Sequence, residues 1–316
     1  MELPRYILLE KAVGETPLQR MEAWRTQAGI AAHVPLTYAG RLDPMASGQL
    51  LVLVGEECKK KDKYLALDKT YQFSVLLGIG SDTHDVLGLL QTDPPLQTDT
   101  PSLRALGAAR PRFTLQESTS VIEAGPGEEL DQLREVVRLG LASRSAAEGS
   151  WSDSELYKQL QDICQNLAGD IKLPYPHFSS KTVAGKPLFQ WALEDRLDEI
   201  EIPTKASTIY SLELNKTETL LKTEVCDQAR TKIDTIPEVT DEHKRLGNDF
   251  RRVDIRQDWE NLKHDDSQPD QYVIAHFTCH CSSGTYMRTL AKIIGEQLDP
   301  AVPSLAWSID RTEIKL

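Results

Sequence analysis

The chain has 316 residues and a hydrophobic content of 40%, which is enough for one large or two ordinary domains with a substantial core. Its formal net charge of −12 argues against a typical nucleic-acid-binding protein, because such proteins neutralise phosphates with Lys and Arg. No apolar stretch approaches the length of a membrane span, and the N-terminus lacks a basic region followed by an apolar one, so we expect a cytoplasmic protein.

The first predicted elements are a strand and a helix. Residues 6–11 form a short apolar run, which is typical of a strand. Gly14 interrupts the run, and Thr16 followed by Pro17 is the pattern of a helix N-cap with proline at the first helical position. We therefore expect a helix that begins at Pro17.

The next stretch, residues 37–57, combines a loop with a buried strand. Two glycines and Pro44 punctuate its first half, and Pro44 disfavours the helical region for Asp43, so we expect a rigid loop that carries a carboxylate. Residues 50–54 form a continuous apolar run, which predicts a strand buried on both faces. Loops on such a scaffold often carry chemistry, although an aspartate there also commonly serves only to cap a turn.

A basic run and a second strand follow. Residues 59–63 read Lys-Lys-Lys-Asp-Lys, the densest basic run in the chain. Such a run usually marks a solvated face, but Lys59 and Lys60 are also candidate phosphate contacts if the protein binds RNA. Residues 69–78 combine apolar, β-branched and aromatic residues, which predicts a strand that ends at Gly78.

Two segments hold most of the negative charge. Residues 92–170 carry 7 basic and 13 acidic residues, and residues 225–270 carry 8 and 12, which leaves a net charge of only −2 for the rest. A basic groove elsewhere is therefore compatible with the acidic total. We interpret residues 92–150 and 225–270 as two acidic insertions in a single domain, residues 1–316.

The two predicted insertions differ in pattern. The first is rich in Pro, Ser and Thr and has an amphipathic piece at residues 130–141, so we expect it to be partly helical. The second is charged and is expected to be helical around residues 242–259. Its pattern is compatible with either a partner surface or simple solvation.

Between the insertions, three further elements are predicted. A capped helix begins at Ser152 and runs towards residue 167, where Gly169 ends it. Residues 174–192 read as a proline-rich loop that leads into a helix, and residues 206–214 read as a strand.

The C-terminal part predicts a strand followed by an amphipathic helix. Residues 272–281 alternate as a strand does, and Thr285 can cap a helix. The apolar face of that helix contains Met287, Leu290, Ile293 and Ile294. Arg288 lies in the first turn, where a basic residue opposes the helix dipole, so we expect a carboxylate or phosphate partner for it.

Cysteine and histidine gather in the same strand, and both are zinc ligands. Strand geometry places Cys279 and Cys281 on one face and His280 on the other, and the sequence offers no second ligand pair to accompany them and His276. We therefore favour a structural strand over a metal site. The 5 cysteines lack the spacing of a disulfide framework and are expected to be free thiols.

Three motifs in order resemble those of the TruB-type pseudouridine synthases. Residues 40–48 read Gly-Arg-Leu-Asp-Pro-Met-Ala-Ser-Gly, close to the catalytic motif Gly-Thr-Leu-Asp-Pro-Leu-Ala-Thr-Gly of this family. Lys69-x-Tyr71 precedes a strand and an Asp-Thr-x-Asp sequence, as in the second motif. Residues 281–290 resemble the third motif, Cys-Ser-x-Gly-Thr-Tyr-x-Arg-x-Leu.

The resemblance implies roles for specific residues. Asp43 would be the catalytic residue, Tyr71 would stack on the target base, and Arg288 would pair with Asp43 and keep it ionised and oriented. Residues expected to contact the substrate are Lys11, Tyr38, Arg41, Lys59, Lys60 and Ile309. Of these, Ile309 would line the base pocket, and Tyr38 stands where the family often has a histidine that helps to extrude the uridine.

The resemblance also implies a fold and a function. We expect an α/β (α+β) pseudouridine synthase fold, whose central mixed, mostly antiparallel sheet is flanked by helices and which lacks the appended RNA-binding PUA domain. The protein would be a monomeric isomerase that needs no cofactor or metal and converts uridine to pseudouridine at position 55 in the T stem-loop of tRNA. Alternatives are another RNA substrate, or an RNA-binding helper of tRNA folding.

Overall fold

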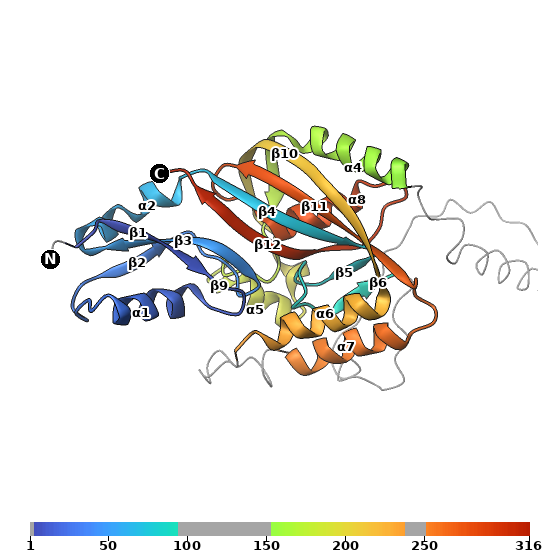
Figure 1. The fold of residues 1–316 in the computed structure, drawn as a ribbon, viewed down its shortest axis with the longest axis horizontal. Helices are drawn as coiled ribbons and strands as arrows, with labels where there is room; N and C mark the ends of the chain where they lie inside the picture. The colour runs from blue at the N-terminus through green and yellow to red at the C-terminus, as the bar shows by residue number, and fades with distance from the viewer. Residues whose placement is uncertain (1–2, 94–152, 238–250) are drawn as a thin grey trace, which may run out of the picture.

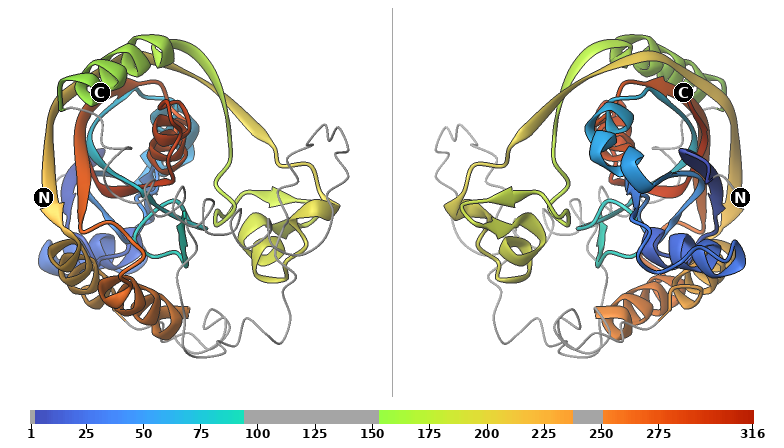
Figure 2. Two further views of the ribbon diagram at one scale, coloured as in Figure 1. Left: turned by 90° about the vertical axis from the view of Figure 1, so that its right-hand side faces the viewer. Right: turned by 90° about the vertical axis from the view of Figure 1, so that its left-hand side faces the viewer.

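The computed structural model describes residues 3–93, 153–237 and 251–316, which form one curved sheet with helices on both faces (Figures 1 and 2). The sheet has 8 strands. In spatial order they are β1 (Tyr6–Lys11), β3 (Ala46–Val54), β12 (Ser304–Ile314), β4 (Lys69–Leu77), β11 (Gln271–Cys281), β10 (Thr204–Leu221) and β7 (Gly169–Pro174), with β2 (Leu36–Ala39) paired to β3. Each pairing is antiparallel except that of β3 with β12. The prediction of an α+β fold with a mixed, mostly antiparallel sheet is confirmed.

Helices and two small hairpins complete the described architecture. The helices are α1 (Pro17–Gln27), α2 (Lys61–Leu65), α4 (Asp153–Leu167), α5 (Leu188–Leu193), α6 (Lys222–Asp234), α7 (Arg252–His264) and α8 (Met287–Glu296). The hairpins pair β5 (Ile79–Ser81) with β6 (Leu90–Thr92) and β8 (Thr182–Val183) with β9 (Lys186–Pro187). Figure 2 shows α5, β8 and β9 in a small lobe that stands off from the sheet at the ends of β7 and β10.

Alternate side chains of the central strands enter two separate cores. Val75 and Phe277 pack with α4 and α8 on one face, whereas Leu76 and Ile274 pack with α6 and α7 on the other. Figure 1 shows α4 and the α6–α7 pair on opposite sides of the sheet. This alternation follows from the two-residue period of a strand, and it gives the protein two apolar cores of different helices.

Strand β3 is buried on both faces, as its continuous apolar run predicts. Leu50 and Val52 pack with Met21 of α1, while Leu51 and Leu53 pack against the opposite side, where α2 lies. All four leucine and valine side chains from residue 50 to residue 53 are 0% exposed. The loop that precedes β3 is therefore mounted on one of the most deeply buried strands of the sheet.

Most of the predicted elements are confirmed. Thr16 caps α1 in a capping box with Gln19, and β1, β3, β4, α4 and β11 lie where the patterns indicate. Two details are wrong. The strand predicted at residues 206–214 extends over all of β10, and Thr285 does not cap α8, because its hydroxyl donates to the Ser282 carbonyl at 3.1 Å.

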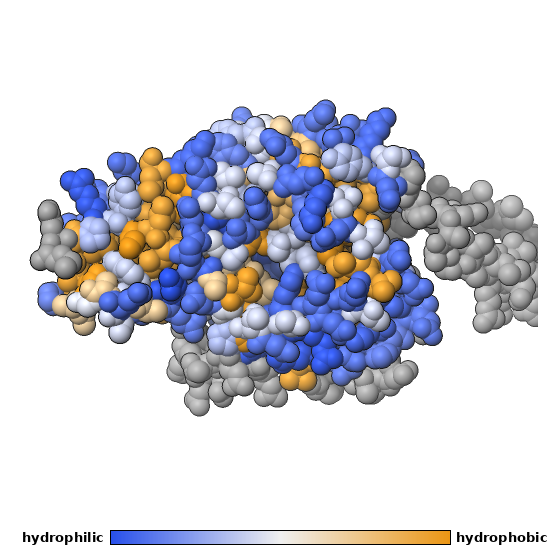
Figure 3. Space-filling view, in the orientation of Figure 1, coloured by the Kyte–Doolittle hydropathy of each residue, from blue (hydrophilic) through white to orange (hydrophobic). Residues whose placement is uncertain are grey.

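The second acidic segment contributes to the core. Its helices α6 and α7 bury Val225, Ile255 and Trp259 completely, at 0% exposed, while their outer surface is hydrophilic (Figure 3). The helical prediction for residues 242–259 is confirmed over the part covered by α7; residues 238–250 lie outside the described chain. The prediction for residues 92–150, including the piece at 130–141, lies almost entirely outside it too.

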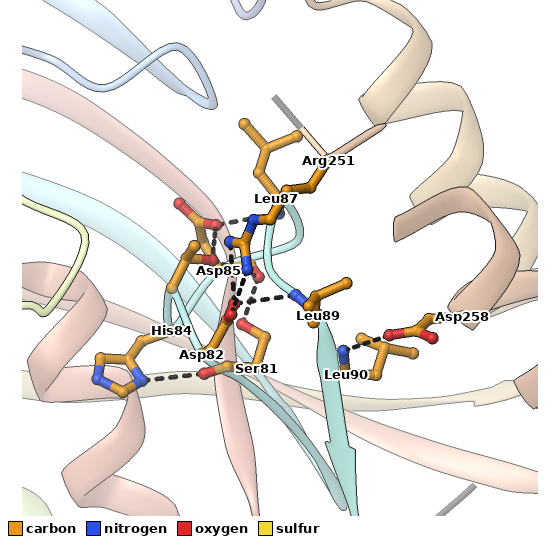
Figure 4. A network of polar contacts seen from close by, with 10 residues as sticks. Ser81, Asp82, His84, Asp85, Leu87, Leu89, Leu90, Arg251 and Asp258 are labelled. Carbon is orange, nitrogen blue, oxygen red and sulfur yellow. Dashed lines mark hydrogen bonds and ion pairs between the residues drawn. The ribbon is translucent and has the colours of Figure 1, made fainter. Parts of the chain in front are cut away.

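The turn between β5 and β6 is held by its own polar side chains (Figure 4). Asp85 accepts hydrogen bonds from the Thr83 hydroxyl at 2.6 Å and from the Leu87 amide at 3.0 Å. His84 has a left-handed backbone conformation, with φ of 61°, and its Nδ1 lies 3.1 Å from the Ser81 carbonyl. Burial lowers the pKa of His84 to about 3, so this imidazole is neutral in the folded protein at pH 7.

Gly48 is required where β3 meets β12. It has φ of +102°, and an added Cβ would lie 2.3 Å from the Arg311 carbonyl oxygen, a backbone atom that cannot move aside. Gly55, just beyond the other end of β3, has φ of +61° with open space around its Cβ direction. Gly48→Ala should therefore lower the free energy of unfolding by about 1–3 kcal/mol more than the control Gly55→Ala, measured by urea denaturation. Equal losses would show that β3 and β12 can separate here at little cost.

The neutral state of His84 predicts a pH dependence of stability. Because the pKa of His84 is lowered on folding, the unfolded chain binds the extra proton, and stability is lost as pH falls from 6.5 towards 3. The loss attributable to His84 should be about 1.4 kcal/mol per pH unit in this window. His84→Asn, which tolerates the left-handed backbone, should flatten the urea-denaturation profile between pH 6.5 and 4.5, and the exposed control His33→Asn should not. Parallel profiles for the wild type and His84→Asn would contradict this assignment.

Candidate active site

Backbone hydrogen bonds hold the loop that carries Asp43 in place. The Gly14 amide donates to the Pro44 carbonyl at 2.9 Å, and the Ala46 amide donates to the Asp43 carbonyl at 3.0 Å. The Lys11 ammonium is 1% exposed and donates to the Ala46 carbonyl at 2.5 Å. Burial lowers the pKa of Lys11 to about 8. The loop is thus fixed on both sides of Asp43, while the Asp43 side chain stays 39% exposed.

Arg288, the second residue of α8, points at Asp43. Its Nε lies 2.9 Å from Asp43 Oδ2 and 3.8 Å from Asp85 Oδ2. Its terminal nitrogens donate to the Thr83 carbonyl at 2.9 Å and to the Phe178 carbonyl at 3.2 Å. The carboxylate partner expected from the unfavourable helix position is therefore present, and each of the three guanidinium nitrogens has an acceptor.

The charges of this cluster depend on one another because the cluster is buried. Burial by itself would lower the pKa of Arg288, but the charges of Asp43 and Asp85 outweigh burial, and the net shift raises this pKa. Burial raises the pKa of Asp85, and the nearby Arg288 partly opposes that shift. Of the two carboxylates, only Asp43 is open to solvent, so it is the one that can reach a bound molecule.

A cavity of about 740 Å³ opens beside this ion pair. It is lined by residues 40–43, Ala46, Leu65, Lys69, Tyr71, Tyr175, residues 178–181, Phe189, Gln190, residues 283–288, Ile309 and Arg311. Asp43, Tyr71, Arg288 and Ile309, which lie far apart in the sequence, therefore share one pocket, and Arg41 lies at its edge. Tyr71 is opposite Arg311 in the β4–β12 register, and burial raises the pKa of its hydroxyl.

Two basic residues of the pocket, Arg311 and Lys69, are not among the site residues predicted from the sequence. Arg311 is 1% exposed and donates to the Gln49 carbonyl at 2.8 Å and to the Gly40 carbonyl at 3.2 Å, so it ties together the two ends of the Asp43 loop. Lys69 donates to the carbonyls of Leu65 and Leu67, and burial lowers its pKa to about 8. The basic type of Arg311 was visible in the sequence, but nothing in its spacing indicated a contact 262 residues away along the chain.

The small lobe of α5, β8 and β9, together with the segment that leads into it, supplies the opposite wall of the pocket. Tyr175 lies against Tyr286, with ring centroids 5.1 Å apart, and Lys181 lies 5.3 Å from the Tyr175 ring centroid. The Arg41 guanidinium reaches across the pocket and donates to the Ser180 hydroxyl at 2.9 Å. These contacts make the wall both aromatic and basic.

The other predicted contact residues lie outside the pocket lining. Lys11 is buried beneath the Asp43 loop, and Tyr38 of β2 packs with the apolar cluster around α1. Lys59 and Lys60 pair with Glu56 and Glu57 at 2.6 and 3.1 Å, in the 3-10 turn before α2.

The cysteine–histidine strand has the geometry expected from its alternation. Cys279 and Cys281 are both 0% exposed and pack in the core with α4 and α8. His280 points the other way, with its ring centroid 4.8 Å from that of Tyr210. Over the residues described, no group of three His, Cys, Asp or Glu side chains gathers in a way that would hold a metal ion. Within the same residues, no helix combines the length and apolar character needed to cross a membrane.

Comparison with known proteins gives a consistent family. The model of the TruB family pseudouridylate synthase N-terminal domain matches residues 32–114. The tRNA pseudouridine synthase B of Caldicellulosiruptor saccharolyticus is 24% identical over 212 residues, which is 66% of this chain and 50% of that protein. The enzyme of the same name from Bifidobacterium longum is 25% identical over 297 residues, 92% of this chain and 58% of that protein.

The chain spans about half the length of the curated relatives that it matches. Among solved structures, a chain from a crystal structure of a Cbf5-Nop10-Gar1 complex aligns with a TM-score of 0.46 and 12% identity, over 98% of this chain and 48% of that chain. The match at residues 32–114 contains the Asp43 motif, and the relatives extend the likeness beyond it. The chain is therefore similar to the TruB family of pseudouridylate synthases over residues 32–114 and, at 23–25% identity, to the curated enzymes named tRNA pseudouridine synthase B.

Proposed function

We propose that this protein is an RNA pseudouridine synthase that isomerises uridine 55 in the T loop of tRNA. The observation that carries the proposal is the contact between Asp43 and Arg288 at 2.9 Å, at the wall of a pocket that also contains Tyr71 and Ile309. The relatives named tRNA pseudouridine synthase B support the same reaction and substrate. A single catalytic domain, a monomeric state and a cytoplasmic location belong to this proposal.

The reaction is an isomerisation within one nucleotide. The bond between N1 of uracil and C1′ of ribose breaks, the base turns, and a bond between C5 and C1′ forms. C5 then loses its proton and N1 gains one, so atoms and electrons balance without an oxidant or reductant. The proposal accordingly assigns no part to a cofactor or metal.

In this proposal, Asp43 acts on the sugar or the base. Its side chain is 39% exposed, lines the pocket and pairs with Arg288, whose own position is fixed by two backbone carbonyls. It would serve as a nucleophile at C1′ or at the base, or as the base that starts glycal formation. In each case, Arg288 would keep the carboxylate ionised and aimed.

The target base must leave its stack before Asp43 can reach it. Extrusion costs a few kcal/mol and calls for a closed pocket with an aromatic surface. Tyr71 would supply that surface, and Ile309 would contact the base from β12. A cavity of about 740 Å³ is large enough for a nucleotide.

The pocket is basic although the whole chain is acidic, so RNA binding at this site is compatible with the net charge of the chain. The lining contains five basic residues, Arg41, Lys69, Lys181, Arg288 and Arg311, and one acidic residue, Asp43. The net charge of −12 is therefore not the charge that an RNA meets at this site. Lys59 and Lys60, which are exposed outside the pocket, would contact phosphates farther along the substrate.

The proposed reaction is tested with an unmodified tRNA transcript, with pseudouridine mapped by chemical derivatisation. Wild type should modify the T-loop uridine, Asp43→Ala should form no product, and the exposed control Asp266→Ala should match wild type. Binding of tRNA without any modification by wild type would instead favour the folding-helper alternative. Modification of a different RNA only would favour another substrate.

The basic rim predicts a salt-dependent contribution to binding. Arg41 and Lys181 are exposed at the pocket edge, so Arg41→Ala and Lys181→Ala should each weaken tRNA binding and reduce the slope of log affinity against log salt by about 1. Affinities measured by filter binding at several salt concentrations provide the check. Lys216→Ala on β10, outside the pocket lining, should leave the slope unchanged, and an equal effect there would deny the rim a special role.

A further inference from the structure

Arg251 lies at the start of α7, in the second acidic segment. None of the three sequence motifs includes this segment. The Arg251 backbone has φ of 63°, a left-handed conformation that is unusual for a side chain other than glycine. Its side chain is 16% exposed and is absent from the pocket lining. It nevertheless contacts two segments that hold Arg288.

The first contact is with Asp82, in the turn between β5 and β6 (Figure 4). Arg251 donates to Asp82 Oδ2 at 2.6 Å and to Oδ1 at 3.4 Å, and Oδ1 also accepts the Leu89 amide at 2.9 Å. Asp82 is followed directly by Thr83, whose carbonyl accepts the hydrogen bond from Arg288. Arg251 therefore binds the residue next to one that accepts a hydrogen bond from Arg288.

The second contact is with Phe178, in the segment that leads into the small lobe of α5, β8 and β9. The guanidinium carbon of Arg251 lies 4.4 Å from the centroid of the Phe178 ring, close enough for a cation–π contact. The carbonyl of the same Phe178 accepts the other terminal hydrogen bond of Arg288, at 3.2 Å. Both backbone acceptors of Arg288 thus belong to segments that one Arg251 side chain holds.

Helix α7, which follows Arg251, contacts the turn between β5 and β6 and packs in the same core as the end of the Asp43 loop. Asp258 of α7 accepts the Leu90 amide at 2.9 Å, and the Trp259 indole donates to the Val86 carbonyl at 3.4 Å. Met45, two residues after Asp43, packs in the same apolar core as α6 and α7. The helix pair, the turn before β6 and the Asp43 loop therefore share one packed core.

We propose that Arg251 is a positioning residue for catalysis, which fixes the Thr83 and Phe178 carbonyls and through them the direction in which Arg288 holds Asp43. The inference rests on the proposed function of the Asp43–Arg288 pair. A guanidinium suits this task because its planar fork binds a carboxylate while its face stacks on an aromatic ring, which an ammonium does not reproduce. The second acidic segment thereby takes part in the reaction without touching the substrate.

The test compares Arg251→Met, which keeps an unbranched flexible side chain and removes its charge, with Arg251→Lys, Asp82→Asn and the control Arg256→Met. Arg256 lies on the same helix and pairs with Asp234 at 2.7 Å, away from both segments. The measurements are the single-turnover rate at saturating tRNA, the tRNA dissociation constant and the melting temperature. Arg251→Met should lower the rate by about 10- to 100-fold, the effect of a misplacement of roughly 1 Å, with binding within about twofold of wild type. Arg251→Lys should recover only part of the rate, and Arg256→Met should keep all of it.

The other outcomes overturn the proposal in separable ways. A dissociation constant that rises while the saturated rate is unchanged would make Arg251 an RNA contact. An unchanged rate and affinity in Arg251→Met would show that Arg288 needs no such support. If Arg251→Met fails to fold, a full rate in folded Asp82→Asn would still refute the proposal, while a reduced rate would support it. An inactive wild type would instead be a failure of the proposed function.

Discussion

The structure depends on how it compensates one buried positive charge. Arg288 is 7% exposed, and an unpaired guanidinium at that depth would be strongly destabilising. Asp43, Asp85 and the carbonyls of Thr83 and Phe178 together surround it. These acceptors come from three separate parts of the chain, because Thr83 and Asp85 share one turn, and the segments that carry them must converge for the charge to be satisfied. The same convergence aims Asp43 into the pocket.

A second constraint acts where β3 and β12 run side by side in parallel. Gly48 allows the two backbones to approach closely, and Arg311 from β12 donates to Gly40 and Gln49 on either side of the Asp43 loop. The loop is therefore closed by a side chain from the far end of the sequence. Such a long-range clamp makes the geometry of Asp43 a property of the completed sheet and not of the loop alone.

Basic residues gather at the pocket, whereas acidic residues gather in the second acidic segment, residues 225–270. The pocket wall is basic, whereas the outer surface of α6 and α7 is hydrophilic and belongs to an acidic segment. Because exposed charges are screened within about 10 Å at 0.1 M salt, a molecule in the pocket would respond to the charges of the lining residues more than to the net charge of the chain. The helices of the acidic segment have a further role beneath that surface, because they complete the core on which Met45 and the turn at Asp85 rest.

Local patterns in the sequence determined the strands β1, β3, β4 and β11 and the cap of α1, because each depends on neighbours within about ten positions. The choice of Asp43, Tyr71 and Arg288 as site residues came instead from the resemblance of three motifs to those of a known family. The need of Arg288 for an anion could also be predicted, from its place in the first turn of α8. Only the tertiary structure decided that Asp85 shares this charge, that Arg311 closes the Asp43 loop, and that Lys11 lies beneath it while Lys59 lies outside the pocket. These placements depend on which distant segments the sheet brings together, and residue type and spacing along the chain carry no record of that pairing.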